Sequence, residues 1–382
     1  MGKRHLCMGL ALLMQAATLP AEIAVSANDG KALSIDAPNE PRTADSIAVL
    51  DLRGATVRIL ATLTVPGTLV GPPGTVAVTP NSRLAIVTVG QIIDGAGKPV
   101  PADIVSVVDI SRPSVPRLVQ TLHAGAGAAG VAINPAGTLA LIANMGADSL
   151  SVFRIAKGQV SPVETIALEP KSRPVDVAFA DNGRAAYVVA QGTNQLLRFS
   201  IENGRVTRTG AAVAMAAGPY SLALDPRRQR AYVSHLGGRA PSTAPGPKPG
   251  SVAVVDLKTG HIVDQVDTGV TPEHVGLSPS GRYLQVTVNN GSALPASSPA
   301  FHDYGLMTIY RVDGAMMKPV AETRTGRWCQ GAVWSADEKR VLLQCSYRKQ
   351  IEVYRFDGRS LTAGDSMTLD ARPGAIATAR SR

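Results

Sequence analysis

Residues 219–226 read Pro219-Tyr-Ser-Leu-Ala-Leu-Asp-Pro226, and residues 174–181 read Pro174-Val-Asp-Val-Ala-Phe-Ala-Asp181. Each is a short apolar strand that ends at a turn residue, and a second apolar strand follows it. Four more segments share the pattern: Gly74-Thr-Val-Ala-Val-Thr-Pro80, Gly130-Val-Ala-Ile-Asn-Pro135, Pro272-Glu-His-Val-Gly-Leu-Ser-Pro279 and Cys329-Gln-Gly-Ala-Val-Trp-Ser-Ala336. Their turn positions 80, 135, 181, 226, 279 and 336 are separated by 55, 46, 45, 53 and 57 residues. Self-similarity at such a period predicts a repeat architecture.

Each repeat continues with a third strand rich in Val and Ile, such as Ile104–Asp109 and Ser251–Asp256, and then a more variable fourth strand. Three residues before each turn stands a small or β-branched side chain: Ala77, Ala132, Ala178, Ala223, Gly276 or Val333. Small side chains at a fixed strand position let neighbouring sheets pack closely. Four antiparallel strands in about 40 to 57 residues are typical of a β-propeller blade.

The two chain ends supply a seventh blade. Residues 372–377 match a first strand, but the chain stops before the turn. Near the N-terminus we expect a turn at residues 29–31, a second strand at 32–35, a third at 46–51 and a fourth at 57–65. One C-terminal and three N-terminal strands would close the ring and remove exposed sheet edges. The sequence therefore predicts an all-β fold, a single seven-bladed propeller with four antiparallel strands per blade.

The composition of the 382 residues fits one large all-β unit. Gly and Pro number 37 and 27, as expected for a chain with many tight turns. Aromatic residues make up only 4% of the chain, which argues against stacking platforms for bases or sugars. The net charge of +9 is dispersed along the sequence rather than clustered, so nothing in it favours nucleic-acid binding.

The N-terminus has the order of a secretory signal peptide. Lys3, Arg4 and His5 precede an apolar run that is too short to cross a bilayer permanently, and small residues follow. Cleavage could follow Ala17, Ala21 or Ala27, and the small-x-small pattern favours Ala27. The sequence thus predicts a signal peptide at residues 1–27, a propeller at 28–382, and a periplasmic or secreted protein without a membrane span.

Two cysteines remain after such a cut, Cys329 and Cys345. The expected hairpin of blade six turns around residues 337 and 338, which places Cys329 within one residue of the position opposite Cys345. Facing positions in antiparallel strands can meet disulfide geometry, and an exported protein folds in an oxidising compartment. We therefore expect a disulfide between these two residues.

The second-strand segments read Tyr232-Val-Ser-His235, Tyr187-Val-Val-Ala190 and Leu141-Ile-Ala-Asn144. With the turns and the Val-rich third strands, the mature chain resembles the YVTN-repeat, lactonase-like family of bacterial seven-bladed β-propellers. These motifs specify the blade and not the chemistry. The resemblance implies a lactonase, a subunit of a periplasmic dehydrogenase, or a binding protein.

Candidate site residues gather at one predicted face, where the loops entering the innermost strands meet the loops between second and third strands. Three of those loops, at residues 90–103, 236–250 and 289–303, are long and could cover a pocket or be surface insertions. His235, His274 and Glu273 come from the adjacent blades four and five and could act in general base catalysis, although structural or surface roles are also open. No spacing typical of a metal site accompanies them.

A second group of candidates would bind a ligand. Arg173, Arg327 and Arg372 precede or begin innermost strands, where guanidinium groups could attract a carboxylate or phosphate or simply be surface charge. Polar residues in the innermost strands or at the ends of second strands could also contact a ligand or bond within the fold: Asp176, Ser221, Asn144 and Gln191.

Three functions follow from these patterns. The first is an exported monomeric propeller that binds a small ligand, with an anionic ligand as one option, or a protein partner at the loop-bearing face. The second is a lactonase-type hydrolase in which the histidines and Glu273 activate water and the arginines hold a carboxylate or stabilise an oxyanion. The third is the propeller subunit of a periplasmic dehydrogenase, whose cofactor would reside in another chain, since no cofactor motif is present here.

Overall fold

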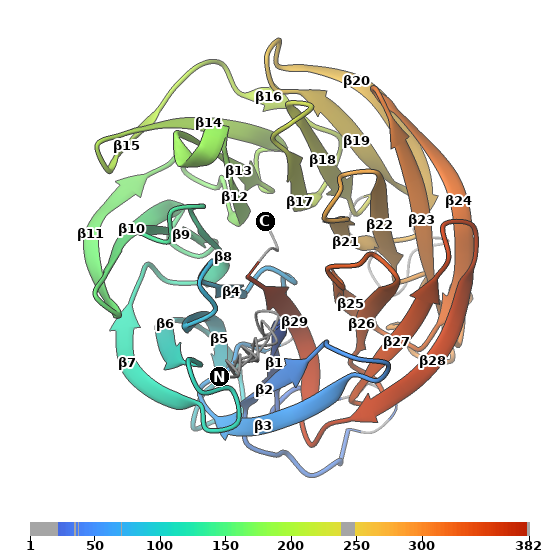
Figure 1. Cartoon of the computed structure of the whole chain (residues 1–382). Coiled ribbons are helices and arrows are strands. Elements are labelled where there is room, and N and C mark those ends of the chain that lie inside the picture. Colours follow the sequence, from blue (N-terminus) through green and yellow to red (C-terminus); the bar gives the residue numbers. More distant parts are fainter. Residues whose placement is uncertain (1–21, 34–35, 37, 70, 238–248, 380–382) are drawn as a thin grey trace, which may run out of the picture.

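Seven antiparallel sheets stand in a ring, each with four strands from the centre to the circumference, and the sheet of blade three has a short fifth strand in addition (Figure 1). The structure is a computed structural model that describes residues 22–33, 36, 38–69, 71–237 and 249–379. The predicted fold class is confirmed. Each blade contains the strands in chain order from the centre outward, except the seventh, whose order is β29-β1-β2-β3.

The strands occupy equivalent places in each blade. The innermost strands of blades one to seven are β4 (Val76–Val78), β8 (Ala128–Ile133), β12 (Pro174–Ala180), β17 (Pro219–Asp225), β21 (Pro272–Leu277), β25 (Cys329–Trp334) and β29 (Arg372–Thr378). The second strands are β5 (Leu84–Ile93), β9 (Leu139–Asn144), β13 (Ala185–Ala190), β18 (Arg230–His235), β22 (Tyr283–Val288), β26 (Arg340–Cys345) and β1 (Ile23–Asp29).

The third strands are β6 (Pro99–Asp109), β10 (Ser149–Ala156), β14 (Gln195–Glu202), β19 (Gly250–Asp256), β23 (Gly305–Asp313), β27 (Gln350–Phe356) and β2 (Ser46–Asp51). The fourth strands are β7 (Arg117–His123), β11 (Gln159–Ala167), β15 (Arg205–Arg208), β20 (His261–Gly269), β24 (Met316–Thr325), β28 (Leu361–Thr368) and β3 (Arg58–Thr64), and the short β16 (Val213–Ala214) also pairs with β14. Within the described residues the single helix is the 3-10 turn η1 (Asp181–Gly183), and no helix is long and apolar enough to cross a membrane.

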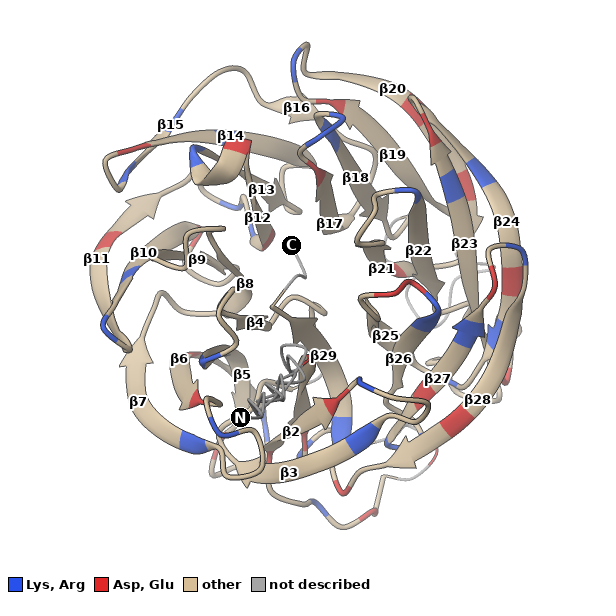
Figure 2. Ribbon diagram, viewed as in Figure 1, with Lys and Arg blue, Asp and Glu red and all other residues tan. Residues whose placement is uncertain are grey.

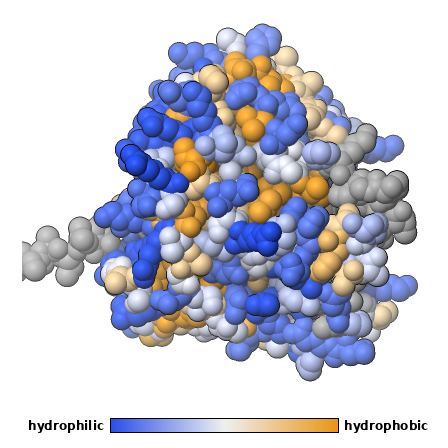
Figure 3. All heavy atoms as spheres, turned by 90° about the vertical axis from the view of Figure 1, so that its right-hand side faces the viewer, coloured by the Kyte–Doolittle hydropathy of each residue, from blue (hydrophilic) through white to orange (hydrophobic). Residues whose placement is uncertain are grey.

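Burial follows the order of the strands. Every residue is buried in several inner strands, namely β1, β2, β8, β9, β12 and β13. Outermost strands such as β3 and β20 consist of exposed and half-buried residues. The apolar clusters lie between neighbouring blades, as where Val177 of β12 packs with Leu141 of β9. On the outside, basic and acidic residues are interspersed (Figure 2), and hydrophobic side chains lie in small groups among hydrophilic ones (Figure 3).

Two expected segments differ from the structure. The second strand of blade seven is β1, Ile23–Asp29, which takes the place expected for residues 32–35, of which 34 and 35 lie outside the described residues. One C-terminal and three N-terminal strands close the ring as predicted. The segment 90–103 is not a loop, because β5 continues to Ile93 and β6 begins at Pro99, so the two strands extend as a hairpin. Of the second long loop, residues 238–248 lie outside the described residues.

Cys329 and Cys345 form the expected disulfide, and they face each other in the register of β25 and β26. The bond ties the first residue of an innermost strand to the last residue of its neighbour. It therefore fixes the start of β25 at the loop-bearing end of blade six.

The N-terminal strand bears on where a signal peptide could be removed. The favoured cut after Ala27 would remove five of the seven residues of β1, which pairs with both β2 and β29. Ahead of it, Leu52 N donates to Glu22 O over 2.9 Å. We predict that export leaves Glu22 in the mature chain, as a cut after Ala21 would. Intact-mass measurement of the exported protein tests this, and a chain that starts at Asn28 would contradict it.

Candidate functional site

A cavity of about 500 Å³ lies at the loop-bearing face of the ring. Its lining consists mainly of residues at or just before the start of the innermost strands and of residues at or just after the end of the second strands. These are the two sets of residues that the sequence predicts at this face. The lining includes residues of blades two to six and of the segment that leads into blade one, among them Leu69, Pro72, Ala128, Ala129, Met145, Arg173, Gln191, Asn194, Tyr220, Glu273 and Gln330.

The wall of the cavity formed by blades four to six is polar. Tyr220, Glu273 and Gln330 are each the second residue of an innermost strand, in β17, β21 and β25. Because neighbouring blades repeat the same register, these side chains form one arc. The opposite wall is apolar, with Leu69 and Pro72 before blade one and Ala128 and Ala129 at the start of blade two.

Glu273 is the buried carboxyl group of this cavity. Its side chain belongs to a residue that is 9% exposed, and Asn289 Nδ2 donates a 3.5 Å hydrogen bond to Glu273 Oε1. Burial raises the pKa of Glu273 to about 7, and the Asn289 bond lowers it only in part. Among the described residues no Lys, Arg or His forms an ion pair with Glu273. A carboxyl group with such a pKa can exchange a proton near neutral pH.

The loop 289–303 positions the partner of Glu273. Asn289 Oδ1 accepts from Ser292 Oγ over 3.1 Å and from Ala293 N over 3.0 Å. Ser292 Oγ in turn accepts from Trp328 N over 3.0 Å, which ties this loop to the entrance of β25. The third long loop thus supports the cavity from blade five.

Gln330 is a cavity residue that sequence reasoning missed. It is 4% exposed, and within the described residues its buried Oε1 has no hydrogen-bond partner. The signal was present in the repeat, since Gln330 stands in the same register position as Glu273 and Tyr220. An acceptor buried without a donor costs free energy, so Gln330 is a candidate for contact with a ligand.

Arg173 and Gln191, both predicted to bind a ligand, line the same cavity from blade three. The backbone of Arg173 adopts a positive φ of 46°, and its N donates to Asp148 Oδ1 over 2.8 Å. The guanidinium group reaches Met145 Sδ at 3.6 Å and forms no ion pair among the described residues. Arg173 is therefore positioned at the rim while its charge stays available.

The two histidines lie elsewhere. His235 is 1% exposed, its Nδ1 is 3.3 Å from Ser251 Oγ, and burial lowers its pKa to about 4, which keeps the ring neutral at pH 7. His274 Nδ1 is 3.2 Å from Gln285 Oε1, and its side chain lines a second cavity of about 580 Å³ toward the opposite face, beside Val275 and Trp334. Glu273 alone of the predicted catalytic group lines the loop-face cavity.

Two of the predicted arginines are engaged within the fold. Arg327 Nη2 donates to Asp36 Oδ2 over 2.7 Å, and its guanidinium carbon lies 3.8 Å from the centre of the Tyr347 ring. Arg372 is 2% exposed, pairs with Glu40 and donates to Ser346 O over 2.8 Å. Neither lines the loop-face cavity, so the three arginines do not converge on it.

The polar residues of the innermost strands connect neighbouring blades. Asp176 Oδ2 accepts from Leu222 N over 2.9 Å, and Ser221 Oγ accepts from Val275 N over 3.3 Å. A Cβ on Gly130 would lie 2.7 Å from the Asp176 Cα, so blades two and three approach closely there. Asn144 Nδ2 donates to the hydroxyl groups of Ser149 and Ser151 within blade two.

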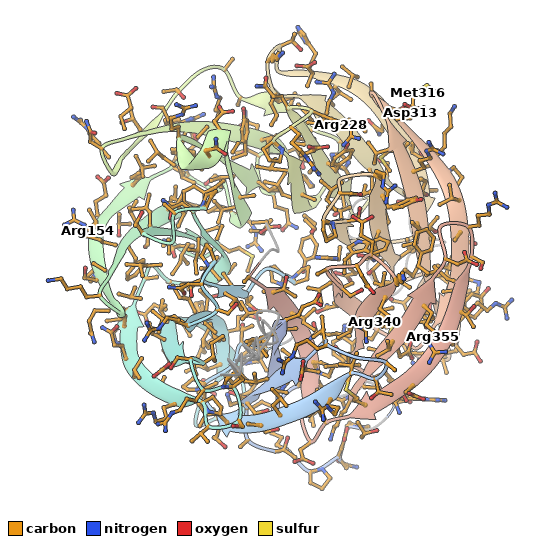
Figure 4. All side chains as sticks on the ribbon, viewed as in Figure 1. Arg154, Arg228, Asp313, Met316, Arg340 and Arg355 are labelled. Carbon is orange, nitrogen blue, oxygen red and sulfur yellow. A yellow bond between two sulfur atoms is a disulfide. The ribbon has the colours of Figure 1, made fainter. Side chains whose placement is uncertain are left out.

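A substitution at Asp176 tests this connecting role. Asp176→Ala removes a buried acceptor and leaves Leu222 N without it, so we expect the free energy of unfolding to fall by about 2 kcal/mol. Urea denaturation measures the change, with the exposed Asp313→Ala as control (Asp313 is labelled in Figure 4). Equal stability of the two variants would contradict the role.

Comparison with known proteins agrees with the geometry. Residues 111–218 match the family described as "Lactonase, 7-bladed beta-propeller". The structure is similar to a putative 6-phosphogluconolactonase from Bacteroides uniformis, with a TM-score of 0.72 and 17% identity over 94% of this chain and 100% of that one. The chain thus resembles the lactonase-like family of seven-bladed β-propellers over residues 111–218 and shares their fold.

Other similar proteins match part of this chain or share only its fold. The uncharacterized protein YncE of Salmonella typhi is 36% identical over 88 residues, which is 22% of each chain. The dihydro-heme d1 dehydrogenase NirN has a TM-score of 0.60 and 15% identity over 97% of this chain and 78% of its own. At such identity the likeness concerns the fold alone.

Proposed function

We propose that this lactonase-like propeller is an exported protein that binds a small ligand with an anionic group in its loop-face cavity. The observation that carries the proposal is the convergence of Arg173, Gln191, Tyr220, Glu273 and Gln330 on one cavity. Its volume of about 500 Å³ falls within the range of small-molecule sites, and an apolar wall faces the polar arc as in many such sites.

The anionic group of the ligand would lie at Arg173. Arginine presents a planar fork of donors that matches carboxylate and phosphate oxygens. In the described lining of the cavity it is the one basic side chain. Export is supported by the N-terminal signal pattern and by the disulfide, which is rare in cytosolic proteins.

A second candidate function, hydrolysis of a lactone, is favoured by one observation. Glu273 has a pKa of about 7 and lines the cavity, so near neutral pH its ionised form could take a proton from water. In such a hydrolase the general base would be Glu273 rather than either of the two histidines. A dehydrogenase subunit, the third alternative, would instead bind its partner chain.

Arg173→Gln tests the binding function. We expect the mature wild-type chain to bind at least one of a panel of probes (gluconate, succinate, inorganic phosphate), and Arg173→Gln to bind it at least tenfold more weakly, since about 1.5–3 kcal/mol of charged hydrogen bonding is lost. Isothermal titration calorimetry measures the affinities, and lactones added to the panel report turnover.

The matched control is Arg154→Gln, which changes an exposed arginine at the outer edge of the ring (Figure 4). It should bind like the wild type. Equal affinities of the Arg173 and Arg154 variants, or no binding of any probe, would contradict the proposal.

A further inference from the structure

The polar arc of the cavity contains two acceptors whose hydrogen bonding is incomplete among the described residues. Gln330 Oε1 is buried without a partner among the described residues. Glu273 receives one long bond from Asn289, and no cation of the described chain pairs with it. The two side chains hold the same register position in β21 and β25, the innermost strands of neighbouring blades, which pack against each other.

These acceptors define the chemistry of the group that would satisfy them. A carboxylate and an amide oxygen together require hydrogen-bond donors, and a buried carboxylate also requires a positive charge. An ammonium group supplies three N–H donors, a full positive charge and no acceptor. A hydroxyl group supplies one donor, brings acceptors of its own and leaves the carboxylate charge uncompensated.

We infer that the ligand of this cavity carries a protonated amine that binds Glu273 and Gln330, while its anionic group lies at Arg173. The site would thus take a small zwitterion. The inference rests on the proposed function, because it specifies the ligand of that same cavity. The two charged groups of the ligand would bind to different blades, since Arg173 belongs to blade three whereas Glu273 and Gln330 belong to blades five and six. The ligand must therefore be long enough to reach from one to the other.

Few other ionisable groups surround Glu273. The charged or titratable side chains on the elements around it and on the cavity wall are Tyr220 and Asp225 on β17, Arg230, Tyr232 and His235 on β18, His274 on β21, Tyr283 on β22, His302 and Asp303 at the end of loop 289–303, and Arg173 at the rim. His235 stays neutral above its pKa of about 4. Arg327, before β25, is paired with Asp36. None of these side chains forms an ion pair with Glu273 in the described part of the chain.

The direction of the pH dependence distinguishes an amine from other ligand groups. An ammonium group binds the ionised form of Glu273, whose pKa in the protein without ligand is about 7. Affinity for an amine should therefore fall about tenfold for each pH unit below 7. A ligand with only an anionic group should show the opposite slope, because ionised Glu273 repels it above pH 7.

The experiment compares matched probes on the mature wild-type chain. Titration calorimetry at pH 6 and pH 8 measures the affinities of ω-amino acids from glycine to 6-aminohexanoate and of the corresponding ω-hydroxy acids. We expect an amino acid of suitable length to bind at least tenfold more tightly than its hydroxy counterpart at pH 8, and to weaken at pH 6. Hydroxy acids that bind as tightly as amino acids would overturn the amine inference and leave anion binding intact.

Variants locate the effect. Glu273→Gln should abolish both the preference for the amine and its pH slope, whereas Glu164→Gln, the same change on the exposed outer strand β11, should alter neither. Gln330→Ala should reduce the preference and keep the slope, and it carries the test if Glu273→Gln fails to fold. A preference that survives in Gln330→Ala and Glu273→Gln would overturn the inference. Absence of binding by every probe would overturn the proposed function as well.

Discussion

The antiparallel pairing of β29 with β1 is the constraint on which the rest of the structure depends. It joins residues from the two ends of the chain, with Val25 facing Ala377 and Ser26 facing Ile376. The seventh blade exists only when both ends are in place, and closure of the ring gives every innermost strand two neighbours. The loop-face cavity takes residues from blades around this ring, so its shape depends on the same closure.

Contacts between blades transmit that constraint to the cavity. Gln344 Nε2 of blade six donates to Ser26 Oγ of blade seven over 2.7 Å, and Trp334 Nε1 donates to Gly276 O of blade five over 3.1 Å. With the bonds of Asp176 and Ser221, such side chains hold the innermost strands in register. Because the strands keep this register, Tyr220, Glu273 and Gln330 lie on one wall of the cavity. These polar residues of the innermost strands therefore have one of two roles. Those at the second position of the strand line the cavity, whereas Asp176 and Ser221 at the third position bind the backbone of the next blade.

The repeat predicted the fold because each blade carries the same strand and turn residues in the same order. The prediction for the second strand of blade seven is wrong for two reasons. Residues 29–31 contain turn-forming residues, so the sequence predicts the strand after them, and the small side chains within Ile23–Asp29 also fit a signal-peptide cleavage site. The loop expected at 90–103 became a hairpin because the strands β5 and β6 continue pairing beyond the body of the blade.

The site could be predicted only where local register decides it. Glu273 and Arg173 follow from their places at innermost strands. The engagement of Arg327 and Arg372 could not be foreseen, because their acidic partners Asp36 and Glu40 lie 291 and 332 residues away in the sequence. The burial that perturbs His235 and Glu273 is likewise a property of packing between blades and not of local sequence.

The central claim is that the cavity holds a buried carboxyl group with no cationic partner among the residues that the structure describes. Infrared difference titration of the wild-type chain against Glu273→Gln, without ligand, measures the protonation of that single carboxyl group. The structure predicts that Glu273 loses its proton with a pKa of about 7. A pKa at the ordinary value of 4.5 would contradict the account, because it would mean that water or a cation reaches the carboxylate.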